Sequence, residues 1–223
     1  MKRLNKAVLA LATAGVLASG VAQAGLESRA GGTMLYDNVL NITWLADANY
    51  AATQFAATGG TQGDADGHMN WTAANAWADD LSYGGYEDWR LPTSLNQDGS
   101  GPCRDYNCTN SEMGHMFYNN LGASAGGSIL IGTNTDNLAL FTNLQSDGYW
   151  SGTAYAPYPA IFAWVFYTNY GDQDTNGQHD EFYAWAVRPG DVAAVPEPEA
   201  YALLLAGLGL LGTIARQRKN KQG

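Results

Sequence analysis

The stretch GGYEDWRLPT, residues 84–93, marks the point where the chain changes from a helical to an extended pattern. Its two glycines stop a helical run. Pro92 breaks any helix and pushes the residue before it toward extended geometry. Arg90 is one of only four Lys and Arg residues in 25–195. We predict that its guanidinium pairs with carboxylates and ties this loop to a sheet, and an anion-binding role is the alternative.

A second rare arginine lies in the closing segment AWAVRPG, residues 184–190, and the same two interpretations apply to it. Arginine suits such a role because its planar fork can bind both oxygens of one carboxylate. The predicted structural motif consists of Asp88, Trp89, Arg90 and Arg188.

The sequence before this stretch predicts strands and then a helix. TMLYDNVLNITWL, residues 33–45, predicts two short strands around a turn. Residues 53–68 are rich in Gly, Thr and Asp, which indicates a loop. The residues that then recur at helical spacing are Trp71, Ala74, Ala78 and Leu81.

The sequence after it predicts a loop, a second helix and a set of strands. Residues 109–112 have the form of a capping box, so we expect a helix to begin near Thr109 and to end at Gly122. Its apolar stripe is Met113, Met116, Phe117 and Leu121. Strand-like runs follow at 138–144, 149–155, 161–169 and 182–189. Strands at both ends with helices between them favour an α+β domain.

The two cysteines, Cys103 and Cys108, lie in the loop of residues 94–108. In an exported protein, two cysteines in one short loop are typical of a disulfide. The alternative is a zinc or redox pair, which needs more ligands or a CxxC spacing, and the sequence has neither.

Charge is distributed unevenly along the 223 residues. Residues 1–24 have a cationic start, an uncharged apolar run and a small-x-small site, which together predict a cleaved signal peptide. Residues 25–195 contain four Lys and Arg against nineteen Asp and Glu, a net charge of −15. Nucleic acid is therefore excluded as a partner, because it requires a basic surface.

The tail combines three features. Pro196, Glu197 and Pro198 come first, an apolar run at 200–215 follows, and four cationic residues lie after it. As a helix, this run would be about 24 Å long, short of the roughly 30 Å bilayer core, so we expect a transient membrane hold. The alternative is a buried core helix, which the absence of a polar face opposes.

The segment DQDTNG, residues 172–177, has the D-x-D-x-N-G opening of a calcium loop. The twelfth position is Tyr183 rather than Glu, so the segment is not an EF-hand. Two interpretations stay open, a solvated hairpin loop and a calcium site. The candidate ligands are Asp172, Asp174, Asn176 and Glu181.

Aromatic residues are dense in 149–188, and most of them are expected to be core. Three tyrosines lie near predicted turns, where they could stack against sugar rings instead. These candidate glycan-binding residues are Tyr155, Tyr158 and Tyr170.

No motif of a common catalytic class is present. The three histidines are scattered, and the sequence has no HExxH, GxSxG, phosphate-binding loop or nucleotide fingerprint. Adjacent acids such as Asp79 and Asp80 are expected to be solvated rather than to form an acid/base pair. We therefore predict a protein that is not an enzyme, with calcium as the one candidate cofactor.

The motifs TWLADAN, NWTAANAWADDL, GGYEDWRLPT, YWSGT and AWAVRPG together resemble the Lcl C-terminal domain family, a bacterial extracellular module. The resemblance covers about residues 33–190. It implies a compact, C-type-lectin-like α+β domain with two helices and with strands from both ends of the module. It implies no catalytic residues.

The tail resembles a PEP-CTERM sorting signal over 196–221, with an apolar helix at 200–215. This resemblance implies a Gram-negative source, partners in the export machinery and an exosortase, and an inner-membrane intermediate. The mature 25–195 domain is then expected at the cell surface or in the extracellular matrix. We predict a non-catalytic binding or structural module associated with exopolysaccharide. The alternatives are a calcium-assisted carbohydrate-binding adhesin and a hydrolase acting on matrix glycans.

Overall fold

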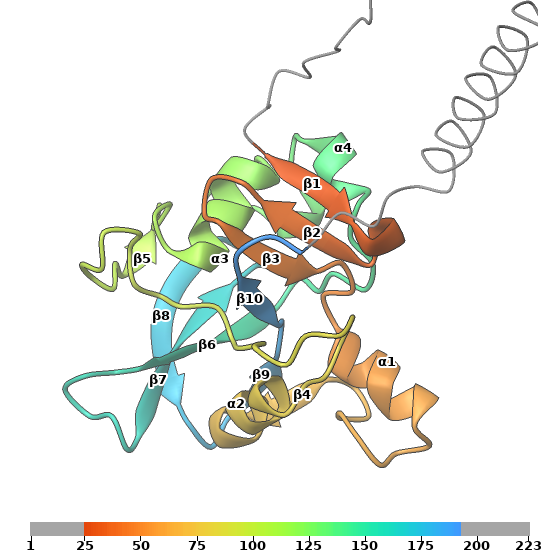
Figure 1. The fold of residues 1–223 in the computed structure, drawn as a ribbon. Helices are drawn as coiled ribbons and strands as arrows, with labels where there is room; N and C mark the ends of the chain where they lie inside the picture. The colour runs from red at the N-terminus through yellow and green to blue at the C-terminus, as the bar shows by residue number, and fades with distance from the viewer. Residues whose placement is uncertain (1–24, 193–223) are drawn as a thin grey trace, which may run out of the picture.

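Two β-sheets form the framework of residues 25–192, the part of the chain that this computed structural model describes (Figure 1). The strands are β1 (Leu26–Arg29), β2 (Met34–Asp37), β3 (Ile42–Leu45), β4 (His68–Asn70), β5 (Asp105–Tyr106), β6 (Gly148–Ala154), β7 (Phe162–Tyr167), β8 (Asp172–Gly177), β9 (Glu181–Tyr183) and β10 (Val187–Pro189). The α-helices are α1 (Tyr50–Ala57), α2 (Trp71–Asp79), α3 (Glu112–Gly114), which continues as a π-helix at His115–Asn120, and α4 (Thr135–Leu138). Two short 3-10 helices lie at Ala30–Gly32 and Ile129–Ile131. The fold is therefore mixed α+β, as the sequence predicts, but α1 and α4 are present in addition to the two expected helices.

The smaller sheet has the strand order β1-β2-β3-β10, and the larger has the order β4-β9-β6-β7-β8-β5. All pairs are antiparallel except β6 with β9. In the smaller sheet, β10 from the end of the domain pairs with β3 from its beginning. Strands from both ends thus lie side by side, as expected, while the likeness to C-type lectins stays a prediction.

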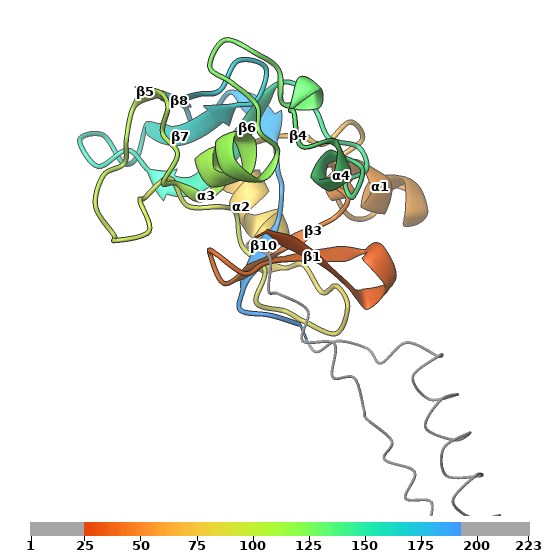
Figure 2. The ribbon, with the colours of Figure 1, turned by 90° about the horizontal axis from the view of Figure 1, so that it is seen from above.

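The hydrophobic core lies between the two sheets around Trp185, which is fully buried. Its ring centroid lies 4.8 Å from that of Trp44 and 5.2 Å from that of Phe141. Its indole N–H donates to the carbonyl of Leu45 at 2.8 Å, so the buried polar atom is satisfied. Figure 2 shows α3 between the sheets, and the four residues of its predicted apolar stripe are all buried.

The run 182–189 was expected to be one strand, and it is two. β9 belongs to the larger sheet and β10 to the smaller one, and residues 184–186 cross between them. The crossing is fixed because Trp185 turns into the core while the carbonyl of Ala186 accepts from the backbone N–H of Leu45 at 3.1 Å. One short apolar run therefore joins the two sheets.

Two further element predictions are wrong. The expected strand at 138–144 is the end of α4 followed by a turn, and only Thr142 forms an isolated bridge, with Asp47. Asn134 favours the helix because its side-chain oxygen accepts from the N–H of Asn137 at 3.3 Å. The expected loop at 53–68 begins as α1, whose alanine-rich sequence has high helix propensity.

The predicted capping box at 109–112 is also wrong. The helix begins after Ser111, whose hydroxyl accepts from the N–H of Gly114 at 3.1 Å. Glu112 does not reach back to a cap because its carboxylate binds Arg90 instead. A tertiary ion pair has replaced the local interaction that the sequence favours.

The predicted signal peptide (1–24) and sorting tail, including the expected apolar helix at 200–215, lie outside the described residues. Within 25–192, no helix has the length and apolar character needed to cross a membrane.

Candidate functional site

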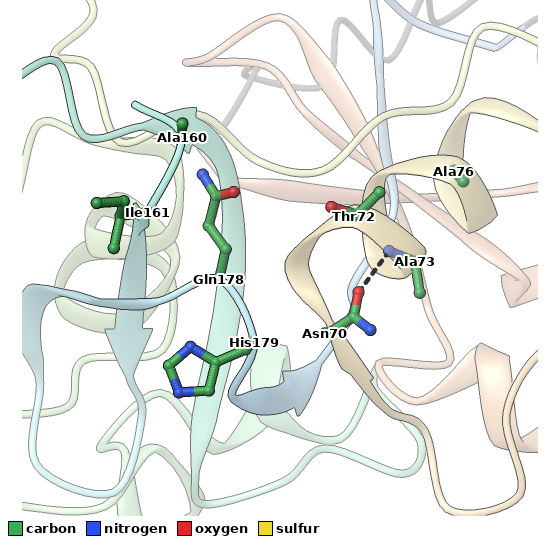
Figure 3. Close-up of a pocket in the computed structure, with 8 residues that line it drawn as sticks. All are labelled: Asn70, Thr72, Ala73, Ala76, Ala160, Ile161, Gln178 and His179. Atoms are coloured by element: carbon green, nitrogen blue, oxygen red, sulfur yellow. Dashed lines mark hydrogen bonds between the residues drawn. The ribbon is translucent and has the colours of Figure 1, made fainter. Parts of the chain in front are cut away.

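A shallow, open groove of about 640 Å³ lies at the end of the domain away from β1 and β2. One wall is the start of α2. The other is formed by the connection that leads into β7 and the connection that follows β8 (Figure 3). The lining residues are Asn70, Thr72, Ala73, Ala76, Ala160, Ile161, Gln178 and His179.

Exposed apolar side chains gather beside the groove, on the connection between β6 and β7. Ile161 is 54% exposed and Tyr158 is 59% exposed. The backbone N–H of Ile161 donates to the carbonyl of Tyr158 at 3.0 Å, so the two residues lie in one turn. The ring of Tyr158 also lies 6.4 Å from those of Tyr155 and Phe162. The turn therefore presents a small aromatic and aliphatic surface to solvent.

Gln178 fixes this turn against the rest of the site. Its side-chain amide donates to the carbonyl of Pro159 at 2.9 Å, and its backbone N–H donates to the carbonyl of Ile161 at 2.8 Å. Its own carbonyl accepts from the N–H of Trp71, the first residue of α2, at 3.1 Å. One residue thus connects both walls of the groove, which favours a preformed site.

The α2 wall begins at Asn70, whose side-chain oxygen caps the helix by accepting from the N–H of Ala73 at 3.0 Å (Figure 3). The indole N–H of Trp71 donates to the carbonyl of Ser151 at 2.7 Å and holds the helix on the larger sheet. The groove therefore combines amide, hydroxyl and imidazole groups with a neighbouring apolar surface. Such a lining can bind a polar, uncharged ligand, and it contains no Asp or Glu.

The structure places the three candidate glycan-binding tyrosines in two different regions. Tyr155 and Tyr158 lie together beside the groove, as described above. Tyr170 lies beyond the other end of β7, where its ring stacks on that of Tyr167 at 5.5 Å and 15°. The five residue steps of β7 separate these regions by about 17 Å, so the three tyrosines do not form one surface.

The candidate calcium segment is strand β8. The sequence pattern predicted a loop in both interpretations, as a solvated hairpin or as a calcium loop, and that shape is wrong. Alternate side chains of a strand lie about 6.6 Å apart on one face, so they do not converge as loop ligands do. Asp174 forms an ion pair with Arg104, and Asn176 donates to the hydroxyl of Tyr167 at 3.0 Å. Glu181 lies in β9, opposite Asn70. Calcium binding stays a prediction.

Asp172, the first residue of β8, has a raised pKa because it is partly buried and lies near the carboxylates of Asp174 and Asp105. Within 25–192, no group of three or more His, Cys, Asp or Glu side chains is arranged to hold a metal ion.

The cysteines and the two motif arginines occupy structural positions. Cys103 and Cys108 are joined by a disulfide. Arg90 binds both carboxylate oxygens of Glu112, at 2.7 and 2.8 Å. Arg188 binds both oxygens of Asp88, at 2.7 and 3.0 Å, and its guanidinium carbon lies 4.1 Å from the centre of the Tyr86 ring.

Trp89, which lies between Asp88 and Arg90 in the sequence, is buried in the core. The guanidinium groups of both Arg90 and Arg188 are occupied by carboxylates, and this opposes the anion-binding alternative.

Sequence reasoning assigned none of the eight lining residues of the groove to a site. Only Asn70 carried a usable signal, because it precedes a helical run and is a favoured capping residue. Ala160, Ile161, Gln178 and His179 come from two connections whose proximity depends on the sheet pairing.

Two family models match the chain. The Lcl C-terminal domain matches residues 33–188, and the PEP-CTERM protein-sorting motif matches residues 194–219. The comparison with curated proteins finds no relative. The sorting motif identifies an exported protein, which an exosortase sorts through the cell envelope to the surface. The chain therefore belongs to the Lcl C-terminal domain family and carries a PEP-CTERM sorting motif after that domain.

Proposed function

We propose that the domain is a non-catalytic module that binds a neutral exopolysaccharide in the groove between α2 and the 155–161 turn. The observation that carries this proposal is the exposed pair Tyr158 and Ile161, at 59% and 54%, beside a lining of amide and hydroxyl groups. Sugars have both an apolar ring face and a rim of hydroxyls, and this surface offers partners for each.

The charge of the domain selects against acidic polymers. The segment 25–195 carries a net charge of −15, and like charges repel over several ångströms even in salt. Of its four arginines, Arg90 and Arg188 are already paired with carboxylates. The supported ligand is therefore a neutral chain.

The same lining favours binding over hydrolysis. Most glycoside hydrolases place two carboxyl groups on either side of the scissile bond. The groove contributes one titratable side chain, that of His179, which lies 3.4 Å from Asp180 on the exposed surface.

The test is an array of neutral and acidic polysaccharides, including the exopolysaccharide of the producing cells, probed with and without calcium. Tyr158→Ala should weaken binding to a neutral polymer about tenfold, equivalent to roughly 1.4 kcal/mol. Tyr106→Ala is the matched control, because Tyr106 is 48% exposed but lies on β5. The proposal fails if the unmodified protein retains no neutral polymer, or if Tyr158→Ala and Tyr106→Ala behave alike.

A further inference from the structure

A second cavity, of about 460 Å³, lies on α2 beside the first groove. Its other wall is the loop at 61–64, which follows α1. The residues that line it are Gln54, Thr61, Gln62, Gly63, Asp64, Met69, Ala73, Ala76, Trp77, Asp80 and Leu81.

Side-chain hydrogen bonds arrange the polar part of this cavity. The indole N–H of Trp77 donates to the side-chain oxygen of Gln54 at 2.8 Å. The amide of Gln54 in turn donates to that of Gln62 at 3.2 Å. A half-buried indole thus lies next to two amides, a combination of apolar and polar groups like that of the first groove.

The 61–64 loop is held in place by its backbone. Gly63 has a φ of +79°, and a Cβ at this position would lie 2.1 Å from the carbonyl oxygen of Ala51. The N–H of Asp64 donates to that same carbonyl at 3.2 Å. The loop therefore lies tightly against α1, and the cavity wall is preformed.

Ala73 and Ala76 line both cavities. They lie on the exposed side of α2, whereas Ala74 and Ala78 lie on its fully buried side. Between the two cavities, the shared lining consists of side chains that are no larger than a methyl group. At these two positions, therefore, no bulky side chain separates the cavities.

We propose that the two cavities form one binding channel across α2, and that its ligand is an internal stretch of a linear, neutral polysaccharide. This inference rests on the proposed function and adds the length of the ligand to it. An α-helix with its side chains is about 10–12 Å wide, so a ligand that occupies both cavities must contain several sugar rings. Asp64 and Asp80 can accept hydroxyl hydrogens in the second cavity and would repel acidic sugars.

The experiment measures affinity against ligand length, with the exported protein purified from its cells. The probes are size-fractionated fragments of a neutral polymer retained on the array, from disaccharides upward. We expect affinity to rise at least tenfold between the disaccharide and fragments long enough to cross α2. Ala76→Trp should remove this rise, because the indole closes the passage between the two cavities. Gln62→Ala, which changes the second cavity alone, should reduce the rise.

Ala57→Trp is the matched control, because Ala57 is exposed at the end of α1 and lines neither cavity. It should keep the full length dependence. Equal affinity for short and long fragments in the unmodified protein would overturn the channel while leaving the first groove intact. An unchanged length dependence in Ala76→Trp would also overturn the channel. Loss of all binding by Tyr158→Ala, with no effect of Gln62→Ala on long fragments, would also confine the site to the first groove.

Discussion

The backbones of Arg90 and Val187 pair through two hydrogen bonds, each 2.8 Å long, that run in opposite directions. This bridge joins the middle of the chain to β10 in the smaller sheet. The arginine side chains extend the connection, because Arg90 binds Glu112 and Arg188 binds Asp88. The two most distinctive stretches of the sequence therefore form one structural unit.

Replacing Arg90 should destabilise the domain. Arg90→Ala leaves Glu112, whose side chain is 11% exposed, without its counterion, and Glu112 also accepts from the N–H of Thr93. We expect a loss of about 3 kcal/mol in the free energy of unfolding, the low end for a broken buried pair, since Arg90 is itself 37% exposed. Urea denaturation measures the loss. Arg90→Lys should recover only part of it, because an ammonium cannot form the fork. A loss below 1 kcal/mol in Arg90→Ala would contradict the structural role.

Stability should fall on mild acidification because of His115. This side chain is buried, and desolvation lowers its pKa below the usual 6.5, although Asp37 at 3.7 Å opposes the shift. The unfolded chain therefore binds the proton more readily than the folded one. The stabilisation of the fold that comes from keeping His115 neutral is fully present above the unfolded-state pKa, and it is lost as pH falls below about 6.5.

The measurement is the melting temperature between pH 7.5 and 5. His115→Gln should flatten this decline, whereas His179→Gln, at an exposed position, should not. An unchanged pH dependence in His115→Gln would assign the decline to other groups.

The disulfide should contribute to stability, because it closes a loop that packs on β8. The side-chain amide of Gln173, which is fully buried, donates to the carbonyl of Cys103 at 2.6 Å. Non-reduced peptide mass spectrometry should find Cys103 and Cys108 linked in exported protein. The double replacement Cys103→Ser, Cys108→Ser should lower the free energy of unfolding by about 2 kcal/mol. Free thiols on both residues of the exported protein would contradict the pairing.

Calcium should leave the melting temperature unchanged, because two of the four candidate ligands, Asp174 and Asn176, already have partners within the domain. Asp174 would have to leave Arg104, and Asn176 would have to leave the hydroxyl of Tyr167. A ligand of the native state raises the melting temperature, so thermal unfolding in millimolar calcium is a direct measurement. A rise that Asp174→Ala abolishes would establish the calcium site.

Sequence patterns predicted the elements whose causes are local. The strand-like run at 161–169 identified β7, and the spacing of Ala74 and Ala78 identified α2 with its buried face. The patterns failed where tertiary contacts decide. Nothing local to 182–189 shows that the chain changes sheets at Trp185, and D-x-D-x-N-G describes an exposed loop and a half-buried strand equally well. The groove depends on the start of α2 and on two connections that meet it only after the sheets form, so composition alone could not locate it.

The sorting tail should act as a temporary handle. Within the described domain, Asp191 is fixed to β1 by the side chain of Arg29, which donates at 2.8 and 2.9 Å, so the chain leaves the fold from a defined point. Glu197 then lies between two prolines, which favour an extended backbone that a processing enzyme can reach. The apolar run at 200–215 is short for a bilayer, and the cationic residues after it favour a cytoplasmic end.

Mature surface protein should therefore lack the residues beyond about Pro198. A C-terminal tag, followed by blotting in cells with and without the exosortase, measures this. Full-length tagged protein should accumulate in the inner membrane when the exosortase is missing, and Glu197→Ala should have the same effect in its presence. Glu199→Ala is the matched control, because it removes a neighbouring carboxylate outside the Pro-Glu-Pro sequence. A tag that stays on mature surface protein in exosortase-positive cells would mean that the tail is a permanent anchor, since processing is the step that a temporary handle requires.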